Sequence, residues 1–133
     1  MKKRVKIAII SLLVLVVPTI IYFTFFSSNG LADLKAVEIN VLQLETIEDG
    51  TYKGLYEYND NVYASVEVTI LNHEITIIDV IENTSSKADL VIEIPIEIID
   101  AQSLQIDDVT GATISSRIVI LAVQNALVDI DNG

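Results

Sequence analysis

The run of small residues from Asp107 to Ser116, DDVTGATISS, offers the most recognisable chemistry in this sequence. Gly111 allows a backbone conformation or a close approach that a side chain would block, and Ala112 leaves the neighbourhood of Thr113 open. An apolar segment typical of a helix follows, so free amide groups and the positive end of a helix dipole are expected there. These features suit a phosphate group. An ordinary capped turn explains the same residues, because Thr-Gly and Ser-Ser pairs are common.

The helix that must position this run is predicted, from its capping residues, to begin at Ser115 or Ser116 and to extend to about Val128. Most of the circumference of this helix consists of apolar residues. The polar side chains form one narrow stripe: Arg117, Gln124 and Asn125. A helix of this kind is buried rather than exposed, and we expect it to pack against a sheet.

Three segments before this helix show the alternation of half-buried strands. The clearest is 62–70, in which Val, Ala and Ile alternate with polar residues and a tyrosine. Strands are also expected at 51–58 and 75–81, separated by short turns at 59–61 and 72–73. Turns this short join neighbouring antiparallel strands. The sequence therefore predicts an antiparallel meander.

The segment between the last strand and the run of small residues reads as helical. Ser85–Ser86 can cap a helix that begins near Lys87. Pro95 can restart this helix, which then continues towards Ala101, and residues 103–108 read as a connector. The predicted fold class is α+β, an antiparallel β-meander packed against helices and preceded by one N-terminal transmembrane helix.

The N-terminal part of the chain predicts a membrane anchor. Residues 7–26 contain no charged side chain and would span roughly 30 Å as a helix, about the thickness of the hydrocarbon core of a bilayer. Four basic residues precede them, and positive residues stay cytoplasmic, so the remainder is expected outside the cytoplasm. A cleaved signal peptide is the alternative, although no clear cleavage site follows. The expected parts are a basic cytoplasmic tail at 1–6, an anchor at 7–26, a connector at 27–47, a domain at 48–129 and a C-terminal tail at 130–133.

Charge is divided unevenly between the two sides of the apolar run. The part of the chain after the run contains four basic residues and all 19 acidic residues. Its net charge is therefore −15. Such a surface repels nucleic acid and excludes it as a partner. The acidic surface serves solubility or attracts a cationic partner. Cysteine is absent, which excludes disulfides and thiolate metal sites, and the one histidine, His73, is expected to be solvated in a turn.

The run of small residues resembles the flavin-attachment motif of FMN-binding domains, which occur in respiratory Na⁺-pumping and Rnf-type complexes and in small flavoproteins of the bacterial surface. That motif is D-x-x-[ST]-G-A-[TS]. The residues that fill it are Asp107, Thr110, Gly111, Ala112 and Thr113. The resemblance covers roughly residues 48–128, from the DGTYKG opening to the helix after the motif. One residue and one segment depart from the family pattern. Ser115 stands where a threonine is frequent, and the turn at 59–64 lacks the basic and aromatic residues that many small relatives carry there.

The resemblance implies that FMN is joined through a phosphoester bond to Thr113. It also implies a cofactor site that includes the rest of the motif: Asp107, Thr110, Gly111, Ala112 and Ser115. A separate flavin transferase would take FMN from FAD with Mg²⁺ and release AMP. A threonine hydroxyl needs a base beside it, and the sequence nearby offers no histidine or lysine for that role. Asp107 is a residue that the transferase could recognise.

Two groups of side chains, the tyrosines of the first strand and the aspartates of the motif, could have either a structural or a ligand-binding role. Tyr52, Tyr56 and Tyr58 lie on one face of the first strand, where they could stack on an isoalloxazine ring or simply pack across the sheet. Asp107 and Asp108 could order the loop by accepting hydrogen bonds from backbone amides. A divalent cation at this pair is the weaker alternative, because further ligands are missing.

The function that the resemblance implies is a membrane-tethered, extracytoplasmic electron carrier with no catalysis of its own. Its expected partners are the flavin transferase, the lipid bilayer, a membrane electron donor and an extracytoplasmic acceptor. A non-catalytic sensory or scaffolding subunit of a membrane redox complex is the alternative. A self-contained flavin reductase is disfavoured, because the sequence has no G-x-G-x-x-G fingerprint for a nicotinamide cofactor.

Overall fold

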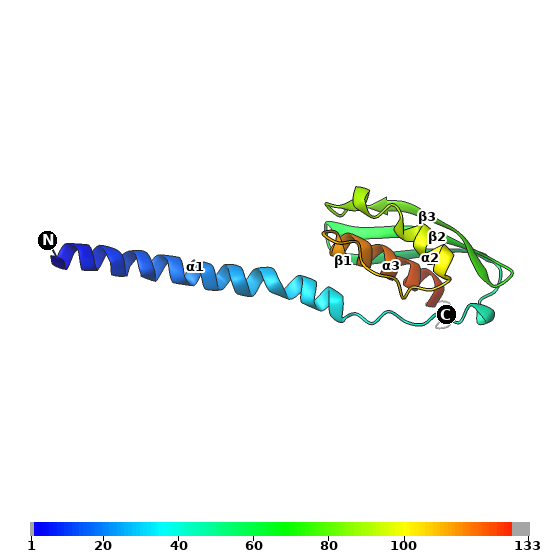
Figure 1. The fold of residues 1–133 in the computed structure, drawn as a ribbon, viewed down its shortest axis with the longest axis horizontal. Coiled ribbons are helices and arrows are strands. Elements are labelled where there is room, and N and C mark those ends of the chain that lie inside the picture. The colour runs from blue at the N-terminus through cyan, green and yellow to red at the C-terminus, as the bar shows by residue number, and fades with distance from the viewer. Residues whose placement is uncertain (1, 129–133) are drawn as a thin grey trace. The chain divides into compact units, whose positions relative to one another are not determined.

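The computed structural model of the chain describes residues 2–128, apart from the side chains of residues 24–29. The chain divides into two compact units, and the division falls between Ala36 and Val37. The first unit is a single helix. The second is an α+β domain, as predicted, in which a three-stranded antiparallel sheet packs against helices (Figure 1).

The first unit is α1 (Lys2–Ala36), which continues past the predicted end of the apolar helix at residue 26. Its residues Lys2–Phe23 have a mean hydropathy of 2.5 and are long enough to cross a membrane. Pro18 lies inside the helix, and the hydroxyl of Thr19 donates to two nearby backbone carbonyls at 3.1 and 2.8 Å. By length and composition, the helix fits a membrane anchor or a signal sequence.

The sheet of the second unit is the predicted antiparallel meander, in the order β1-β2-β3. Its strands are β1 (Gly50–Asn59), β2 (Val62–Leu71) and β3 (Glu74–Asn83). Asn72 and His73 join β2 to β3 with φ angles of 54° and 62°, as a two-residue turn of type I′ requires. His73 is exposed, as expected, but it is also held in place, because its N–H donates to Asp49 Oδ1 and its Nδ1 lies 3.0 Å from Ile47 O.

The segment after β3 forms two short helices: η2 (Ala88–Leu90), a single 3-10 turn, and α2 (Ile94–Ala101). The continuous helix predicted from Lys87 is therefore wrong in its first part. Ser85 does not cap a helix, because its hydroxyl donates to Asn83 Oδ1 at 2.6 Å. Pro95 lies in the first turn of α2, where its fixed φ and missing N–H are tolerated.

Gln102 ends α2 and covers part of one edge of the sheet. Its backbone is left-handed, with φ 49° and ψ 37°. Its side-chain amide accepts a hydrogen bond from Ile75 N and donates one to Ile75 O, both at 2.8 Å. The same nitrogen donates to Ile99 O at 2.7 Å. The side chain therefore replaces a neighbouring strand at this point of β3.

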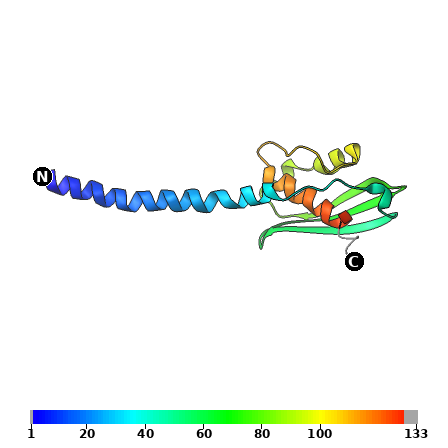
Figure 2. The same ribbon diagram turned by 90° about the horizontal axis from the view of Figure 1, so that it is seen from below.

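The helix α3 (Thr113–Val128) is buried and packs on β1 and β2 (Figure 2). A glycine makes this approach possible, since a Cβ atom on Gly54 of β1 would lie 1.9 Å from Ala122 O. The facing residues of β2 are apolar and buried: Ala64, Val66, Val68 and Ile70. The predicted caps Ser115 and Ser116 are wrong as helix starts, because both lie buried inside the first turn of α3.

The connector before β1 runs along α3 in the same direction as the helix. Arg117 Nη2 donates to Val37 O at 2.8 Å, and further along the helix Gln124 Oε1 accepts a hydrogen bond from Asn40 N at 2.7 Å. Asn125 donates to a backbone carbonyl of β1 at 2.7 Å. The predicted polar stripe of α3 therefore binds backbone groups of its neighbours. The connector also contains one short 3-10 helix: η1 (Leu44–Thr46).

Candidate functional site

The run of small residues forms a turn immediately before α3. Ala112 N donates to Val109 O at 2.9 Å, and Gly111 between them has a φ of 80°. This left-handed conformation strains any residue that has a Cβ atom. A Cβ atom on Gly111 would meet no heavy atom of the described chain within 4 Å. The glycine therefore serves the backbone conformation, and the outer side of the turn is open.

A buried hydroxyl holds this turn from the inside. Ser116 is 0% exposed. Its Oγ accepts a hydrogen bond from Val109 N at 2.9 Å and donates one to Ala112 O at 2.8 Å. The turn thus keeps its shape through contacts within the domain. This role was missed from the sequence, where a serine near the start of a helix reads as a cap. A serine one turn inside an otherwise apolar helix is the signal that indicates it.

Thr113 is the first residue of α3, and it is partly exposed. A hydrogen bond from Ser116 N to Ala112 O, at 2.9 Å, starts the helical pattern. The N–H groups of residues 113–115 therefore have no acceptor inside the helix. These groups and the helix dipole favour a negative charge at this position. The donor set fits a phosphate bonded to the Thr113 hydroxyl.

The other predicted site residues are divided between surface and core. Asp107, Thr110 and Gly111 are exposed around the turn. In contrast, Ala112 is 3% exposed and Ser115 is 2% exposed. The first three are therefore accessible from solvent, whereas Ala112 and Ser115 face the core. The assignment of all five to a cofactor site stays a prediction.

The packing of α3 on β1 determines which tyrosines lie near this turn. Gly54 lies against Ala122. Tyr58 lies four residues along β1 from this contact, a distance of about 13 Å. Thr113 lies nine residues along α3 from the same contact, which is also about 13 Å. Tyr52 lines a cavity with the last turn of α3, so the two elements run in opposite directions. Tyr58 therefore lies at the Thr113 end of the domain, and Tyr52 lies at the other end.

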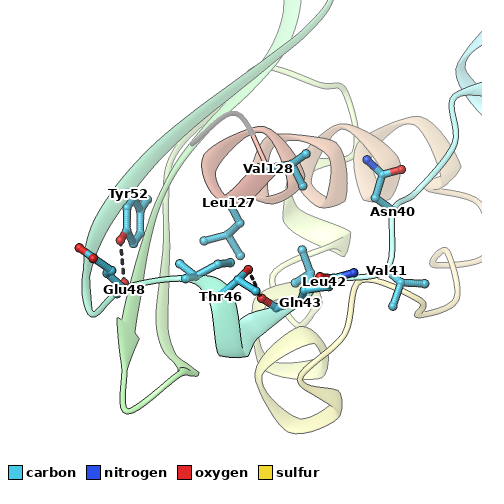
Figure 3. A pocket seen from close by; sticks show the side chains of 10 residues that line it. Asn40, Val41, Leu42, Gln43, Thr46, Glu48, Tyr52, Leu127 and Val128 are labelled. Carbon is cyan, nitrogen blue, oxygen red and sulfur yellow. Dashed lines mark hydrogen bonds between the residues drawn. The ribbon is translucent and has the colours of Figure 1, made fainter. Parts of the chain in front are cut away.

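That cavity has a volume of about 590 Å³ and is formed by the connector, the start of β1 and the last turn of α3 (Figure 3). Tyr52 Oη donates to Glu48 O there at 2.6 Å. Leu127 and Val128 line its α3 side. The helix rises about 22 Å between Thr113 and Val128. A ligand held at the turn before α3 would not occupy this cavity.

Groups that could activate the Thr113 hydroxyl are few. His73 is bonded to the backbone of Ile47, at the end of the domain where the cavity lies. Arg117, one turn after Thr113, donates to the connector. Within residues 2–128 no three metal-binding side chains lie together. The turn offers a hydroxyl and helix N–H groups, and it offers neither a histidine nor a metal cluster in the described part of the chain.

Comparison with known families gives one match. The sequence profile of the FMN-binding domain matches residues 57–128, which is more than half of the chain. The matched segment includes β2, β3, the turn at Gly111 and all of α3. No curated protein matches the chain.

Proposed function

We propose a function from the premise that this chain belongs to the family of FMN-binding domains. FMN is accordingly its cofactor. The chain carries FMN on Thr113 and relays electrons between other redox partners. The observation that supports this most directly is the position of Thr113, a partly exposed hydroxyl at the start of α3 beside the open turn at Gly111.

Attachment of FMN is a phosphoryl transfer that a second protein must catalyse. The Thr113 hydroxyl loses its proton to a base, and its oxygen forms a bond to the FMN phosphorus of FAD. The bond from that phosphorus to the AMP half breaks, so AMP leaves and no electron is transferred. A threonine hydroxyl needs an adjacent base for such a step, and His73 is bonded at the other end of the domain. A flavin transferase with Mg²⁺ supplies the base and the metal on this proposal.

The residues around the turn hold the phosphate end of the cofactor. The N–H groups of residues 113–115 offset the negative charge of the phosphodiester. Ser116 keeps the turn in place from the core. When bound, FMN accepts and releases electrons singly or in pairs. The acidic surface, with a net charge of −15 after the apolar run, disfavours a negatively charged reduced flavin and lowers its reduction potential.

We place the domain outside the cytoplasm, tethered by α1. The length of the apolar stretch Lys2–Phe23 and the four basic residues at its start support this orientation. A cleaved signal sequence would leave the same domain outside but untethered. Retention of the full-length chain in membranes after a high-pH wash supports the anchor, and its release in a shortened form refutes it.

Intact-mass measurement of the chain from its native membrane tests the attachment. We expect a gain of one FMN less one water, and we expect Thr113→Ala to abolish this gain. Ser86→Ala is the matched control, because it removes an exposed hydroxyl outside the motif. A gain that persists in Thr113→Ala refutes Thr113 as the site.

Redox titration tests the electron-carrier role. A reversible flavin signal without NAD(P)H turnover supports a carrier. Absence of flavin after coexpression with a flavin transferase supports the alternative, a scaffolding subunit.

A further inference from the structure

Three large apolar side chains are exposed in the segment after β3, and we call them together the 90–96 patch. It consists of three large side chains: Leu90 at 48% exposure, Ile92 at 72% and Ile96 at 57%. Val91, Ile94 and Pro95 lie between them and point inwards; Val91 is 2% exposed and Ile94 is 0% exposed. The segment is therefore packed on its inner side, and the exposure of the patch is a feature of the folded domain.

Exposed carboxylates lie next to these apolar residues in the chain. Asp89, Glu93 and Glu97 are exposed and adjoin the patch residues in the chain. From residue 85 to residue 112 the sequence contains six acidic residues and one basic residue, Lys87. An apolar centre with a charged border is the composition of a protein docking site. Solubility alone explains the carboxylates but leaves the exposed isoleucines and leucine unexplained.

The patch begins at the end of the domain where α3 starts. Thr84, which follows β3, donates to Asn61 O at 2.9 Å and so holds this segment against the β1–β2 turn. That turn lies beyond Tyr58, at the Thr113 end of the domain. Both views of the ribbon show η2 beside the start of α3 (Figures 1 and 2). A partner on the patch would therefore lie next to the proposed flavin.

The charge of the border determines which partner fits. A second copy of this chain would place the same carboxylates against each other, and an anionic membrane surface would also be repelled. A protein with a basic surface would be attracted and would cover the apolar centre. We propose that the 90–96 patch docks a cationic protein that exchanges electrons with this chain. Docking itself is independent of the flavin, whereas the redox role of the partner rests on the proposed function.

Binding of a basic cytochrome c tests the docking surface. The cytochrome is titrated calorimetrically into the full chain, produced without flavin transferase and held in nanodiscs of zwitterionic lipid, with empty nanodiscs as the blank. We expect saturable binding that weakens by about tenfold when salt is raised from about 0.02 M to about 0.2 M. Binding that does not respond to salt contradicts the proposal.

Removal of the apolar centre tests its contribution. The double variant Leu90→Ser with Ile92→Ser keeps every charge and changes only exposed side chains. We expect it to bind the cytochrome about tenfold more weakly, because truncation of central apolar contacts dominates losses of affinity. Circular dichroism verifies that the variant is folded. Unchanged binding by a folded variant overturns the proposal.

A matched pair of charge reversals tests the location. Asp89→Lys with Glu93→Lys changes the border of the patch, and Glu45→Lys with Glu74→Lys makes the same change in net charge at exposed positions elsewhere. We expect the first pair to weaken binding at least about tenfold more than the second. Equal weakening shows non-specific attraction and overturns the proposal. Self-association through the patch in sedimentation, or binding to anionic vesicles, also overturns it.

Electron transfer separates this proposal from the proposed function. The flavin-loaded chain is reduced anaerobically and mixed with ferric cytochrome c. Each reduced flavin delivers one electron to each of two ferric haems and releases its protons to solvent. We expect the variants to slow this reaction in the same order in which they weaken binding. If the chain docks but a coexpressed flavin transferase attaches no flavin to it, the proposed function alone is refuted; if flavin is attached but the chain does not dock, the patch alone is refuted.

Discussion

Gly54 is the position where one added methyl group should disturb the domain most. In Gly54→Ala the new Cβ would lie 1.9 Å from Ala122 O and 2.7 Å from Ala126 N, and α3 would have to retreat by about 1 Å to restore a contact of 3.0 Å. Backbone atoms cannot rotate away as side chains can. Overpacking usually costs about 1–3 kcal/mol, and retreat of the whole helix also loosens the core beneath it. We expect a loss of about 3 kcal/mol, which lowers Tm by roughly 12 °C or more in a domain of this size.

Gly50→Ala is the matched control for this prediction. It makes the same change in the same strand, but the new Cβ would lie 3.6 Å from Tyr52 Oη, an ordinary contact. We expect its stability to stay within about 0.5 kcal/mol of the unchanged chain. Urea unfolding of the full chain in detergent, followed by the near-ultraviolet dichroism of its tyrosines, measures both variants. A difference below about 1 kcal/mol between them would refute the view that Gly54 sets the distance between α3 and β1.

Three further predictions concern polar side chains. Gln102→Ala should cost about 1–3 kcal/mol of unfolding free energy, because it exposes an edge of β3 and removes three hydrogen bonds; urea unfolding measures this cost, and a neutral effect contradicts it. The pKa of Tyr63 is raised above 10.0, chiefly by its hydrogen bond to Glu82. This bond therefore stabilises the fold below about pH 10 and its contribution is lost as pH rises through the raised pKa; Glu82→Gln should lower the pKa in an ultraviolet phenolate titration. Gln124→Leu should speed hydrogen exchange at Asn40 N by about tenfold, because this amide loses its acceptor, and unchanged exchange would contradict the bond.

The sheet could be predicted from the sequence because its signals are local. Period-two alternation identified β2, and the two-residue turn at Asn72 and His73 identified the hairpin to β3. Each of these signals involves neighbours in the chain. The strands therefore differ from prediction by only a few terminal residues.

The helices were predicted less well because capping preferences are ambiguous. Serine favours a helix start, yet Ser85 bonds to Asn83 and Ser116 bonds to Val109 inside the domain. Whether a serine caps a helix or holds a loop depends on what lies beside it in space. The start of α3 at Thr113 could not be derived from the sequence for this reason.

The site shows the same division between local and long-range features. The motif predicts that Thr113 lies in an open turn just before a helix, and in the structure Thr113 is the first residue of that helix. The position of Tyr58 at this end and of Tyr52 at the other follows from the packing of α3 on β1. That packing joins residues about 70 positions apart, and no pattern within either segment reveals it.

A version of this chain cut at residue 48 would lose more than its tether. Such a cut spares every strand, α2 and α3, and it also spares the whole family match. Nevertheless, Arg117 and Gln124 would lose their backbone partners, and the side of α3 under the connector would meet water. Newly exposed apolar surface promotes aggregation. A truncated protein for crystallisation or electrochemistry should therefore begin at Val37 or earlier.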